Sequence, residues 1–319
     1  MPAMTVYLIP RSPFRGRTLP RSDTLFGAIC WGLRLLFGPT RVERFLHAYD
    51  HGLLPCVLSS MFPYRGSAAA KTHYFPKPLG DPYVLDPLMS DPPTREELTA
   101  LRRLSAVSSV TGDVFSRIIM GAMPDPAVYQ ELLRSPVDAP EVGGQADVHA
   151  PLPEETAGVF FCVKYREENG QDLARDLKTV LYFLADRGIG GGISSGQGQF
   201  KGIEIVEGLP YQEPPDHESQ HVVTLSLTVP DSGLRKVLSK SWYTLERRQG
   251  IVAAMAAAPA AAPLRKDHLL MLQEGSTFPK NGQLCYGALP VVRKAGEGVD
   301  FDVRQYGYAF PVNTKHAQR

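Results

Sequence analysis

A glycine-rich segment in the middle of the chain has the composition of an anion-binding loop. Residues 188–202 contain seven glycines, six of them in the run Gly188-Ile-Gly-Gly-Gly-Ile-Ser-Ser-Gly-Gln-Gly-Gln-Phe200. Glycine adopts positive φ and lets the backbone approach a ligand closely, so successive N–H groups can surround a phosphate. The segment therefore predicts either a phosphate-binding site or a tightly turning connector without a ligand.

The pattern Gly192-Ile-Ser-Ser-Gly196, inside this segment, matches the G-x-S-x-G signature of serine hydrolases. That signature needs a strand before the serine and a helix after it, whereas here a helical pattern comes first and a strand pattern follows. The segment also lacks the G-x-G-x-x-G and Walker patterns of nucleotide-binding loops. We therefore keep a hydrolase with Ser194 as a minor alternative and predict no cofactor.

Basic residues gather in two parts of the sequence that carry few acids. The first forty-one residues contain one acid, Asp23, and residues 235–266 also contain one, Glu246. The cations of the first part are Arg11, Arg15, Arg17, Arg21, Arg34 and Arg41, and those of the second are Arg235, Lys236, Lys240, Arg247, Arg248, Arg265 and Lys266. Both clusters adjoin predicted turns, where phosphate contacts form easily. They predict local nucleic-acid contacts or, equally, solvated faces with acids nearby in space.

Two pairs of histidines have helical spacing, His47 with His51 and His217 with His221. A metal site would need more ligands in register, and neither an H-E-x-x-H motif nor a partnering cysteine is present. We therefore predict no metal site. Since imidazole can protonate a leaving 5′ oxygen near neutral pH, His47 and His51 remain candidate general acids for RNA cleavage.

The overall charge limits what the chain can bind. Its 319 residues carry 34 Lys and Arg against 33 Asp and Glu, which excludes a polybasic protein that coats nucleic acid indiscriminately. With 43% apolar residues, the chain can bury a core. Its four cysteines lie far apart, and its first residues lack the pattern of a signal peptide. These features predict a cytoplasmic protein without a disulfide framework.

The predicted elements place the glycine-rich segment between a helix and a strand. Strand patterns occupy 5–9, 53–62, 158–165 and 201–207, and helical patterns occupy 24–37 and 172–187. The resulting order, β-α-β-insertion-β-α-β, is that of a ferredoxin-like domain, in which four antiparallel strands carry two helices on one face and leave the other face free. Ser22 and Asp23 are expected to cap the first helix. That helix is apolar on nearly every side, so a protein partner or the insertion should cover its excess apolar surface.

Three regions lie outside this order. Residues 80–150 form a predicted insertion with one helix at 94–104, and residues 208–220 form a linker rich in proline and acid. A mainly β second half follows, with strands at 221–229, 269–272, 289–292 and 302–312 and an Ala-Pro tract at 253–263. The sequence thus predicts an α+β protein with domains at 1–207 and 221–319.

An ordered set of motifs resembles the RAMP superfamily and, more narrowly, the fourth Csm subunit of type III-A CRISPR effector complexes. The N-terminal motifs are Arg21-Ser-Asp-Thr-Leu-Phe-Gly-Ala28, Leu58-Ser-Ser-Met-Phe-Pro63, Tyr74-Phe-Pro-Lys-Pro78 and the loop 190–200. The C-terminal motifs are Trp242-Tyr-Thr-Leu-Glu-Arg-Arg-Gln-Gly250, Met271-Leu-Gln-Glu-Gly-Ser276 and Tyr306-Gly-Tyr-Ala-Phe-Pro-Val312. The resemblance spans nearly the whole chain, although residues 148–158 lack the polar and basic run typical of the family.

The resemblance implies two ferredoxin-like domains with antiparallel sheets, the glycine-rich loop before the last strand of the first, and no metal or catalytic residues. It implies a subunit that binds the 5′ repeat-derived tag of the guide RNA (crRNA), contacts the guide–target duplex through a thumb within 80–150, and joins the large polymerase-type subunit to the backbone RAMP subunits. The RNA-binding residues that we predict on this basis are Gly190, Gly191, Ser194, Ser195, Gly196 and Gln197, with Arg11, Arg15, Arg17, Lys77, Arg247 and Arg248 adding charge. The alternatives are a guide-processing endoribonuclease of the same superfamily using His47 or His51, and the equivalent subunit of another type III system.

Overall fold

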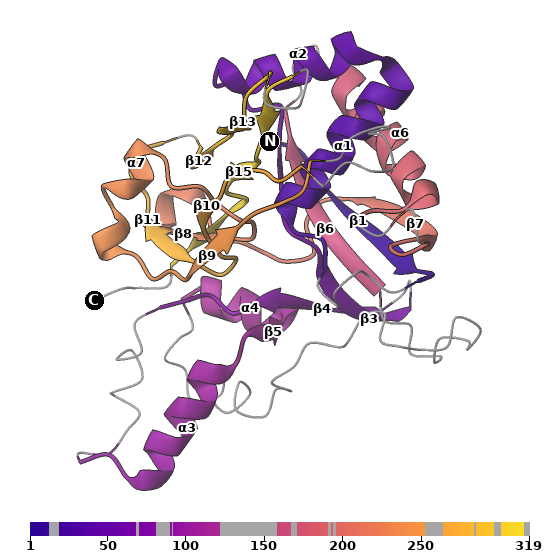
Figure 1. Cartoon of the computed structure of the whole chain (residues 1–319). Helices are drawn as coiled ribbons and strands as arrows, with labels where there is room; N and C mark the ends of the chain where they lie inside the picture. Colours follow the sequence, from indigo (N-terminus) through magenta and orange to yellow (C-terminus); the bar gives the residue numbers. More distant parts are fainter. Residues whose placement is uncertain are drawn as a thin grey trace.

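The computed structural model describes residues 1–12, 19–67, 70–80, 90, 92–121, 158–166, 171–190, 193, 196–252, 264–283, 285–296 and 301–315 (Figure 1). The N-terminal part, residues 1–207, contains β1 (Ala3–Pro10), α1 (Ser22–Phe37), α2 (Pro39–Asp50), β2 (Cys56–Leu58), β3 (Phe62–Ser67), β4 (Ala70–Pro76), α3 (Arg95–Ala106), β5 (Ser109–Thr111), α4 (Gly112–Ile119), β6 (Gly158–Tyr165), α6 (Gln171–Arg187) and β7 (Phe200–Glu207). The strands predicted at 5–9, 158–165 and 201–207 and both sheet-covering helices are therefore present, whereas the run predicted at 53–62 contains β2 and only the first residue of β3.

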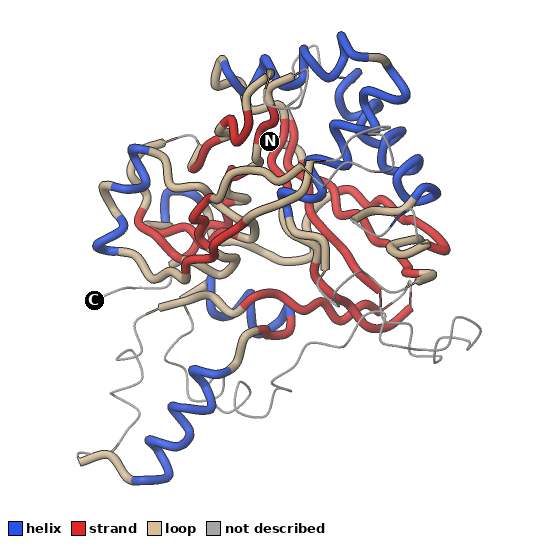
Figure 2. The backbone as a smooth tube through the Cα atoms, viewed as in Figure 1, coloured by secondary structure: helices blue, strands red, loops and turns tan. Residues whose placement is uncertain are grey.

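These strands form one antiparallel sheet in the order β5-β4-β3-β6-β1-β7, with β2 also paired to β6. In its centre, Tyr7 of β1 lies opposite Phe160 of β6 on one side and Glu204 of β7 on the other. Helices α1 and α6 pack side by side on one face (Figures 1 and 2). Their approach is close, because a Cβ at Gly32 of α1 would lie 2.5 Å from Cγ1 of Val180 in α6. Gly32 is thus fixed by helix packing.

The start of α1 differs from the sequence prediction. Arg21 is the N-cap residue, and its side chain makes no capping hydrogen bond. The Ser60 hydroxyl oxygen instead accepts from the Ser22 amide at 3.0 Å, and Oδ1 of Asp23 accepts from the Thr24 amide at 2.8 Å. Ser22 is already helical, and its hydroxyl oxygen accepts a hydrogen bond from the Leu227 amide at 3.1 Å. The prediction of Ser22 as a cap was wrong, because a chain segment 205 residues away supplies the donor.

Helix α2 was not predicted, yet it covers much of the apolar surface of α1. Gly38, with φ of 84°, turns the chain, and Pro39 begins the new helix with its φ already suited to that position. Phe45 of α2 stacks on Phe26 of α1 at 5.7 Å, and Tyr306 of the C-terminal part stacks on the same ring at 4.7 Å. The last turn of α1 keeps apolar exposure, since Phe37 is 40% exposed.

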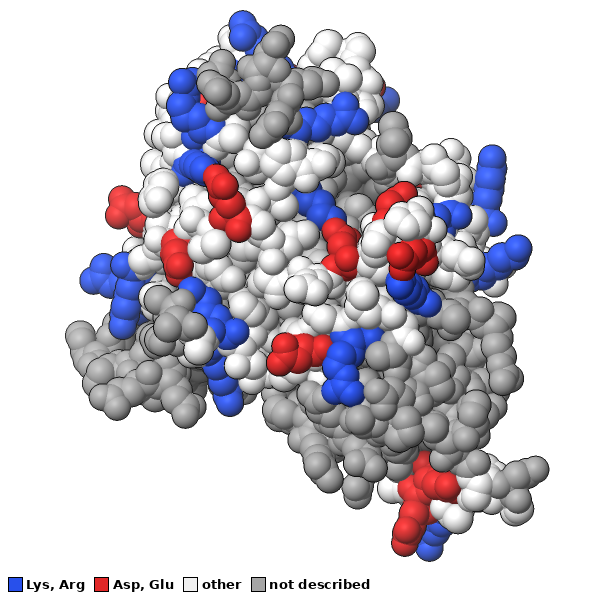
Figure 3. Space-filling model, turned by 180° about the vertical axis from the view of Figure 1, so that it is seen from behind, with Lys and Arg blue, Asp and Glu red and all other residues white. Residues whose placement is uncertain are grey.

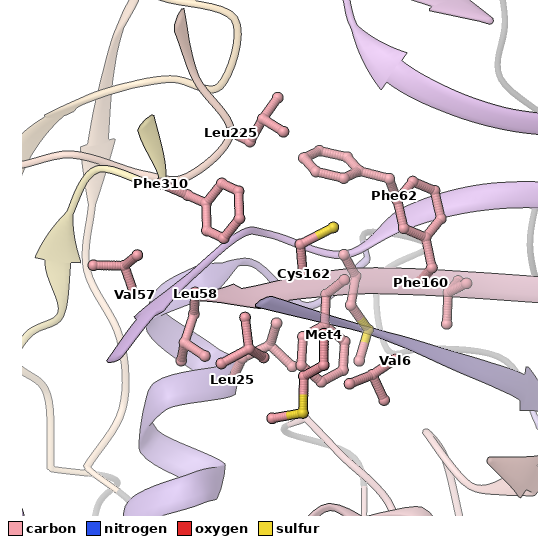
Figure 4. Close-up of a cluster of buried hydrophobic side chains, with 14 of the residues drawn as sticks. Met4, Val6, Leu25, Val57, Leu58, Phe62, Phe160, Cys162, Leu225 and Phe310 are labelled. Carbon is pink, nitrogen blue, oxygen red and sulfur yellow. The ribbon is translucent and has the colours of Figure 1, made fainter. Parts of the chain in front are cut away.

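The sheet face opposite the helices is not free, contrary to the prediction. Close to Cys162 and Phe62 on this face lie Leu225 and Phe310 of the C-terminal part, while Met4 lies on the helix side with Leu25 (Figure 4). All six residues are at most 8% exposed. The two parts of the chain therefore share one hydrophobic core.

The predicted insertion is only partly a protrusion. Helix α3 confirms the predicted helix and extends away from the body (Figure 1). Residues 107–119 instead return to the core, where Phe115 of α4 stacks on Phe75 of β4 at 4.6 Å and both rings are fully buried. Residues 81–89, 91 and 122–150 of the predicted insertion lie outside the described residues.

The C-terminal part, residues 208–315, is mainly β, as predicted. Its elements are β8 (His221–Thr224), α7 (Ser232–Arg235), β9 (Leu245–Arg248), β10 (Leu269–Leu272), β11 (Thr277–Pro279), β12 (Gly287–Ala288), β13 (Val291–Arg293), β14 (Val303–Arg304), β15 (Gly307–Tyr308) and β16 (Pro311–Thr314), with 3₁₀ turns at Asp216–Glu218 and Leu238–Lys240. Strands β11-β8-β16 form a three-stranded sheet, and β9-β10, β12-β15 and β13-β14 form antiparallel ribbons. The strand predicted over 302–312 is divided among β14, β15 and β16. Within the described ranges, no helix has the length and apolar character needed to cross a membrane.

Candidate nucleic-acid interface

The glycine-rich segment consists of a closed base and an open tip. At the base, the Ile189 amide donates to the Gly198 carbonyl at 2.9 Å. A Cβ at Gly198 would lie 2.2 Å from the Ile189 carbonyl oxygen, and one at Gly188 would lie 2.9 Å from the Gly198 oxygen. Both glycines also have positive φ, so the crossing of the two chain segments requires them. The base of the segment therefore has the structure of a tightly turning connector, one of the two predictions for this segment.

The tip has a different surrounding. Gly190 and Gly196 have φ of 113° and 75°, and among the described residues a Cβ at either position would meet no atom within 4 Å. Their positive φ is thus combined with open space, as expected where a backbone admits a ligand. Gln197 is described beside them, whereas Gly191, Ser194 and Ser195 of the predicted site lie outside the described residues.

Arg11 is brought next to this segment by the end of β1. Its amide donates to the Gln199 carbonyl at 2.7 Å, and the Gln199 amide donates to the Ser12 hydroxyl oxygen at 3.0 Å. The Arg11 side chain is exposed. The end of β1 thus places Arg11 of the first basic cluster beside the glycine-rich segment, while Arg15 and Arg17 lie outside the described residues.

Lys77 occupies another place. It follows β4, where its amide donates to the Ser108 carbonyl at 3.0 Å and its own carbonyl lies beside Gly275 of the C-terminal part. Lys71, at the opposite end of β4, is the residue that contacts β7, six residues or about 20 Å of strand away. Burial lowers the pKa of Lys77 to about 8. The structure thus separates Lys77 from the glycine-rich segment.

Arg248 belongs to a network of charged groups between the two parts of the chain. Its guanidinium donates to Asp23 at 2.8 and 3.0 Å, and the Gln305 amide nitrogen donates to the same carboxylate at 2.6 Å. Arg247, its neighbour on β9, is exposed. Of the two roles predicted for the basic clusters, the structure supports pairing with nearby acids for Arg248, not a contact with nucleic acid.

Arg21 completes this inter-part network. It donates to Glu274 at 2.8 Å and to Glu246 at 2.5 Å, and Ser60 also donates to Glu274. Burial alone would lower the pKa of Arg21, but its hydrogen bond to Glu274 and the charges of both carboxylates raise it. Four of the sequence motifs contribute residues to this network, and Gln305, which also belongs to it, directly precedes a fifth motif. Their order along the chain could not have indicated that they meet in space.

Among the residues that the structure describes, Lys and Arg side chains on the face drawn in Figure 3 do not form one continuous patch. Figure 3 shows Lys and Arg side chains interspersed with acidic ones on the face opposite to that of Figure 1. Examples elsewhere are Arg41, which pairs with Asp176 at 2.7 Å, and Lys280, which pairs with Asp216 at the same distance. A nucleic-acid site in this chain must therefore be local.

His47 and His51 lie at the exposed end of α2. Their ring centroids are 4.0 Å apart, and Nδ1 of His51 is 2.9 Å from the His47 carbonyl oxygen. Within the described ranges, no group of three or more metal-ligating side chains is assembled. The glycine-rich segment lies after α6 and before β7, the reverse of the order that a hydrolase nucleophile needs.

Sequence comparison relates the C-terminal part to a known family. Residues 217–314 match the family described as the CRISPR Csm4 C-terminal domain. Over 258 residues, which cover 77% of this chain and 82% of the relative, the chain is 29% identical to the CRISPR system Cms protein Csm4 of Thermococcus onnurineus (strain NA1).

Solved structures share the fold along the chain. A chain of the Csm1–Csm4 cassette in complex with pppApA aligns with a TM-score of 0.58 and 22% identity, covering 100% of both chains. A chain of the Csm3–Csm4 subcomplex in the type III-A CRISPR-Cas interference complex aligns with a TM-score of 0.59 and 16% identity, covering 97% of this chain and 98% of that one. The α+β architecture described above is common to these proteins.

Proposed function

We propose, from the premise that this chain is a Csm4-like subunit of the RAMP superfamily, that it is a non-catalytic subunit of a type III-A CRISPR ribonucleoprotein. In this role it binds the 5′ repeat-derived tag of the guide RNA and links the large polymerase-type subunit to the backbone RAMP subunits. The Csm1–Csm4 and Csm3–Csm4 structures contain relatives of this fold assembled with a second Csm protein, which supports both proposed partners.

The N-terminal part, residues 1–207, is inferred to be a ferredoxin-like domain. The antiparallel order β7-β1-β6-β2, with α1 and α6 packed on one face, supports this assignment. We propose a second ferredoxin-like domain at 221–319, joined by residues 208–220. The extended position of α3 supports a thumb that contacts the guide–target duplex (Figure 1).

The observation that carries RNA binding is the open tip of the glycine-rich segment. Gly190 and Gly196 leave space for a ribose-phosphate group beside a backbone at positive φ, and Arg11 supplies a cation at the adjoining strand end. A single RNA end needs this kind of local contact, which a chain with a net charge of +1 can provide. The predicted tip residues 191, 194 and 195 belong to the same proposal.

The test compares two glycines of the same backbone conformation. Gly196 and Gly282 have φ of 75° and 77°, and a Cβ at either meets no atom within 4 Å, but Gly282 lies in a turn of the C-terminal part. Gly196→Val should weaken protection of a 5′-labelled guide RNA about tenfold or more in complexes reconstituted with the large and backbone subunits. Gly282→Val should leave protection unchanged. Equal protection by the two variants would contradict the proposed site.

A further inference from the structure

The β3–β4 hairpin bends across the sheet and contacts the strand that leads to the glycine-rich segment. Tyr64 of β3 lies opposite His73 of β4, and Gly66 lies opposite Lys71. Lys71 then reaches β7, the strand at the far edge of the sheet, where its Nζ is 2.9 Å from Oε2 of Glu204. Because three strands separate β4 from β7 in the sheet order, this contact requires the hairpin to lie over the sheet face.

The β3–β4 hairpin packs on Tyr7 of β1 through Lys71 and His73. The Lys71 ammonium is 4.3 Å from the centroid of the Tyr7 ring, in the geometry of a cation–π contact. The Tyr7 hydroxyl is 2.9 Å from Nε2 of His73. Tyr7 is 7% exposed and the Lys71 side chain is 10% exposed, whereas the Glu204 side chain is 48% exposed. The lysine is thus enclosed between the ring and the carboxylate.

This contact borders the proposed RNA site. Tyr7 is three residues, or about 10 Å of strand, from Pro10, where β1 meets Phe200 at the end of the glycine-rich segment. Glu204 is four residues beyond Phe200 on β7. If Lys71 were removed, an uncompensated carboxylate would face a site that must hold phosphates, and the hairpin would lose its charged attachment.

We infer that Lys71 and Glu204 form a latch that holds the β3–β4 hairpin over Tyr7 and thereby sets the affinity of the neighbouring site for the RNA 5′ end. The inference rests on the proposed function, because it assigns positioning residues to that site. In this arrangement neither side chain needs to contact RNA, since Lys71 and Glu204 form an ion pair with each other.

Two glutamates of β7 provide a test, because the latch and a purely electrostatic role predict opposite changes in RNA affinity when Glu204 is replaced. Glu204 pairs with Lys71 at 2.9 Å, while Glu207, on the same strand, lies 4.0 Å from Lys178 and has a side chain that is 86% exposed. Glu204→Gln and Glu207→Gln each remove one negative charge from β7. A purely electrostatic role predicts slightly tighter RNA binding by both. The latch predicts that Glu204→Gln weakens binding, on the order of fivefold, while Glu207→Gln does not.

The measurements are affinity for a 5′-labelled guide RNA and amide hydrogen exchange of residues 64–66 and 71–73 in the full chain. Lys71→Met and Glu204→Gln should both weaken binding and speed exchange in the hairpin, and Lys71→Arg should preserve both properties. Tighter binding by Glu204→Gln, or hairpin exchange unchanged in both variants, would overturn the latch. Failure of the unmodified chain to bind guide RNA would instead contradict the proposed function. The exchange experiment needs no RNA, so it tests the attachment of the hairpin separately.

Discussion

Arginines of the two basic sequence clusters lie in two regions of the molecule that have different surroundings. In the inter-part network, Arg21 and Arg248 face Glu246, Glu274 and Asp23 at hydrogen-bonding distance. At the glycine-rich segment, Arg11 is exposed beside a backbone turn with open space. The first region uses its cations to join parts of the protein, whereas the second presents one to solvent. Spacing between charges along the sequence therefore does not separate structural from binding arginines, but the position of acids in space does.

The largest expected effect lies in the inter-part network. Glu274 has a side chain that is 7% exposed, and it accepts hydrogen bonds from Arg21 and Ser60. Glu274→Ala would leave the Arg21 cation in a half-buried site with only Glu246, which should lower the free energy of unfolding by about 3 kcal/mol. Urea denaturation of the full chain at neutral pH measures this loss.

The control for this change is an exposed ion pair. Asp50 pairs with Arg304, and the Asp50 side chain is 42% exposed. Asp50→Ala should change the free energy of unfolding by about 0.5 kcal/mol or less. If Glu274→Ala costs no more than Asp50→Ala, the inter-part network does not stabilise the fold and the contrast between the two regions fails.

A change of intermediate size is expected in the pH dependence of the unfolding free energy, to which His73 of the β3–β4 hairpin should contribute and the arginines of the inter-part network should not. Burial, with the charge of Lys71 adding to it and Asp113 opposing it, lowers the pKa of His73 from 6.5 to about 4. The folded state therefore binds fewer protons than the unfolded state between these values, and its stability falls as the pH falls from 6.5 through 4. Arg21 and Arg248, with raised pKa values, stay charged throughout this range.

The contribution of His73 is about 1 kcal/mol once its partial exposure is allowed for. Wild-type protein should thus lose about 1 kcal/mol more than His73→Phe between pH 7 and pH 4 in urea denaturation. Parallel loss by the two proteins would show that His73 is protonated as easily in the fold as in the unfolded chain.

The smallest expected effect is on RNA affinity alone. Arg11→Ala should weaken guide RNA binding about threefold at physiological salt and reduce the slope of log affinity against log salt by about 0.7, as for loss of one contact to a single strand. Its unfolding free energy should not change. Arg44→Ala, at an exposed position on α2, is the matched control. A slope that is equal in the two variants would remove Arg11 from the site.

Periodicity and turn residues predicted much of the N-terminal sheet and its helices. The runs at 5–9, 158–165 and 201–207 became β1, β6 and β7, and the helical runs became α1 and α6. Helix α2 was missed because Gly38 and Pro39 indicate a helix end, while the same proline is also suited to a helix start. The covered sheet face was missed because Leu225 and Phe310 come from strands whose place in space no local pattern encodes.

For the candidate site, glycine composition located the right segment without distinguishing its two functions. Gly188 and Gly198 are required where chain segments cross, and Gly190 and Gly196 are not, although all four have positive φ. The position of Lys77 shows the opposite case, because this lysine belongs to a motif but follows the end of β4 that is far from the glycine-rich segment. Lys71, three residues before the same motif, is the lysine that borders the site.

Tyr306 has a consequence for how the protein is made. Its ring stacks on Phe26, and its hydroxyl accepts from the Leu58 amide at 3.0 Å, so the first helix lacks part of its packing until residue 306 has been synthesised. At a translation rate of about 5–20 residues per second, the N-terminal segments wait roughly 15 to 60 seconds for it. During that interval the side of Phe26 that Tyr306 covers stays open, although Phe45 and Tyr49 can already pack on the ring, so chaperone contact or an early partner subunit would raise the yield of folded protein.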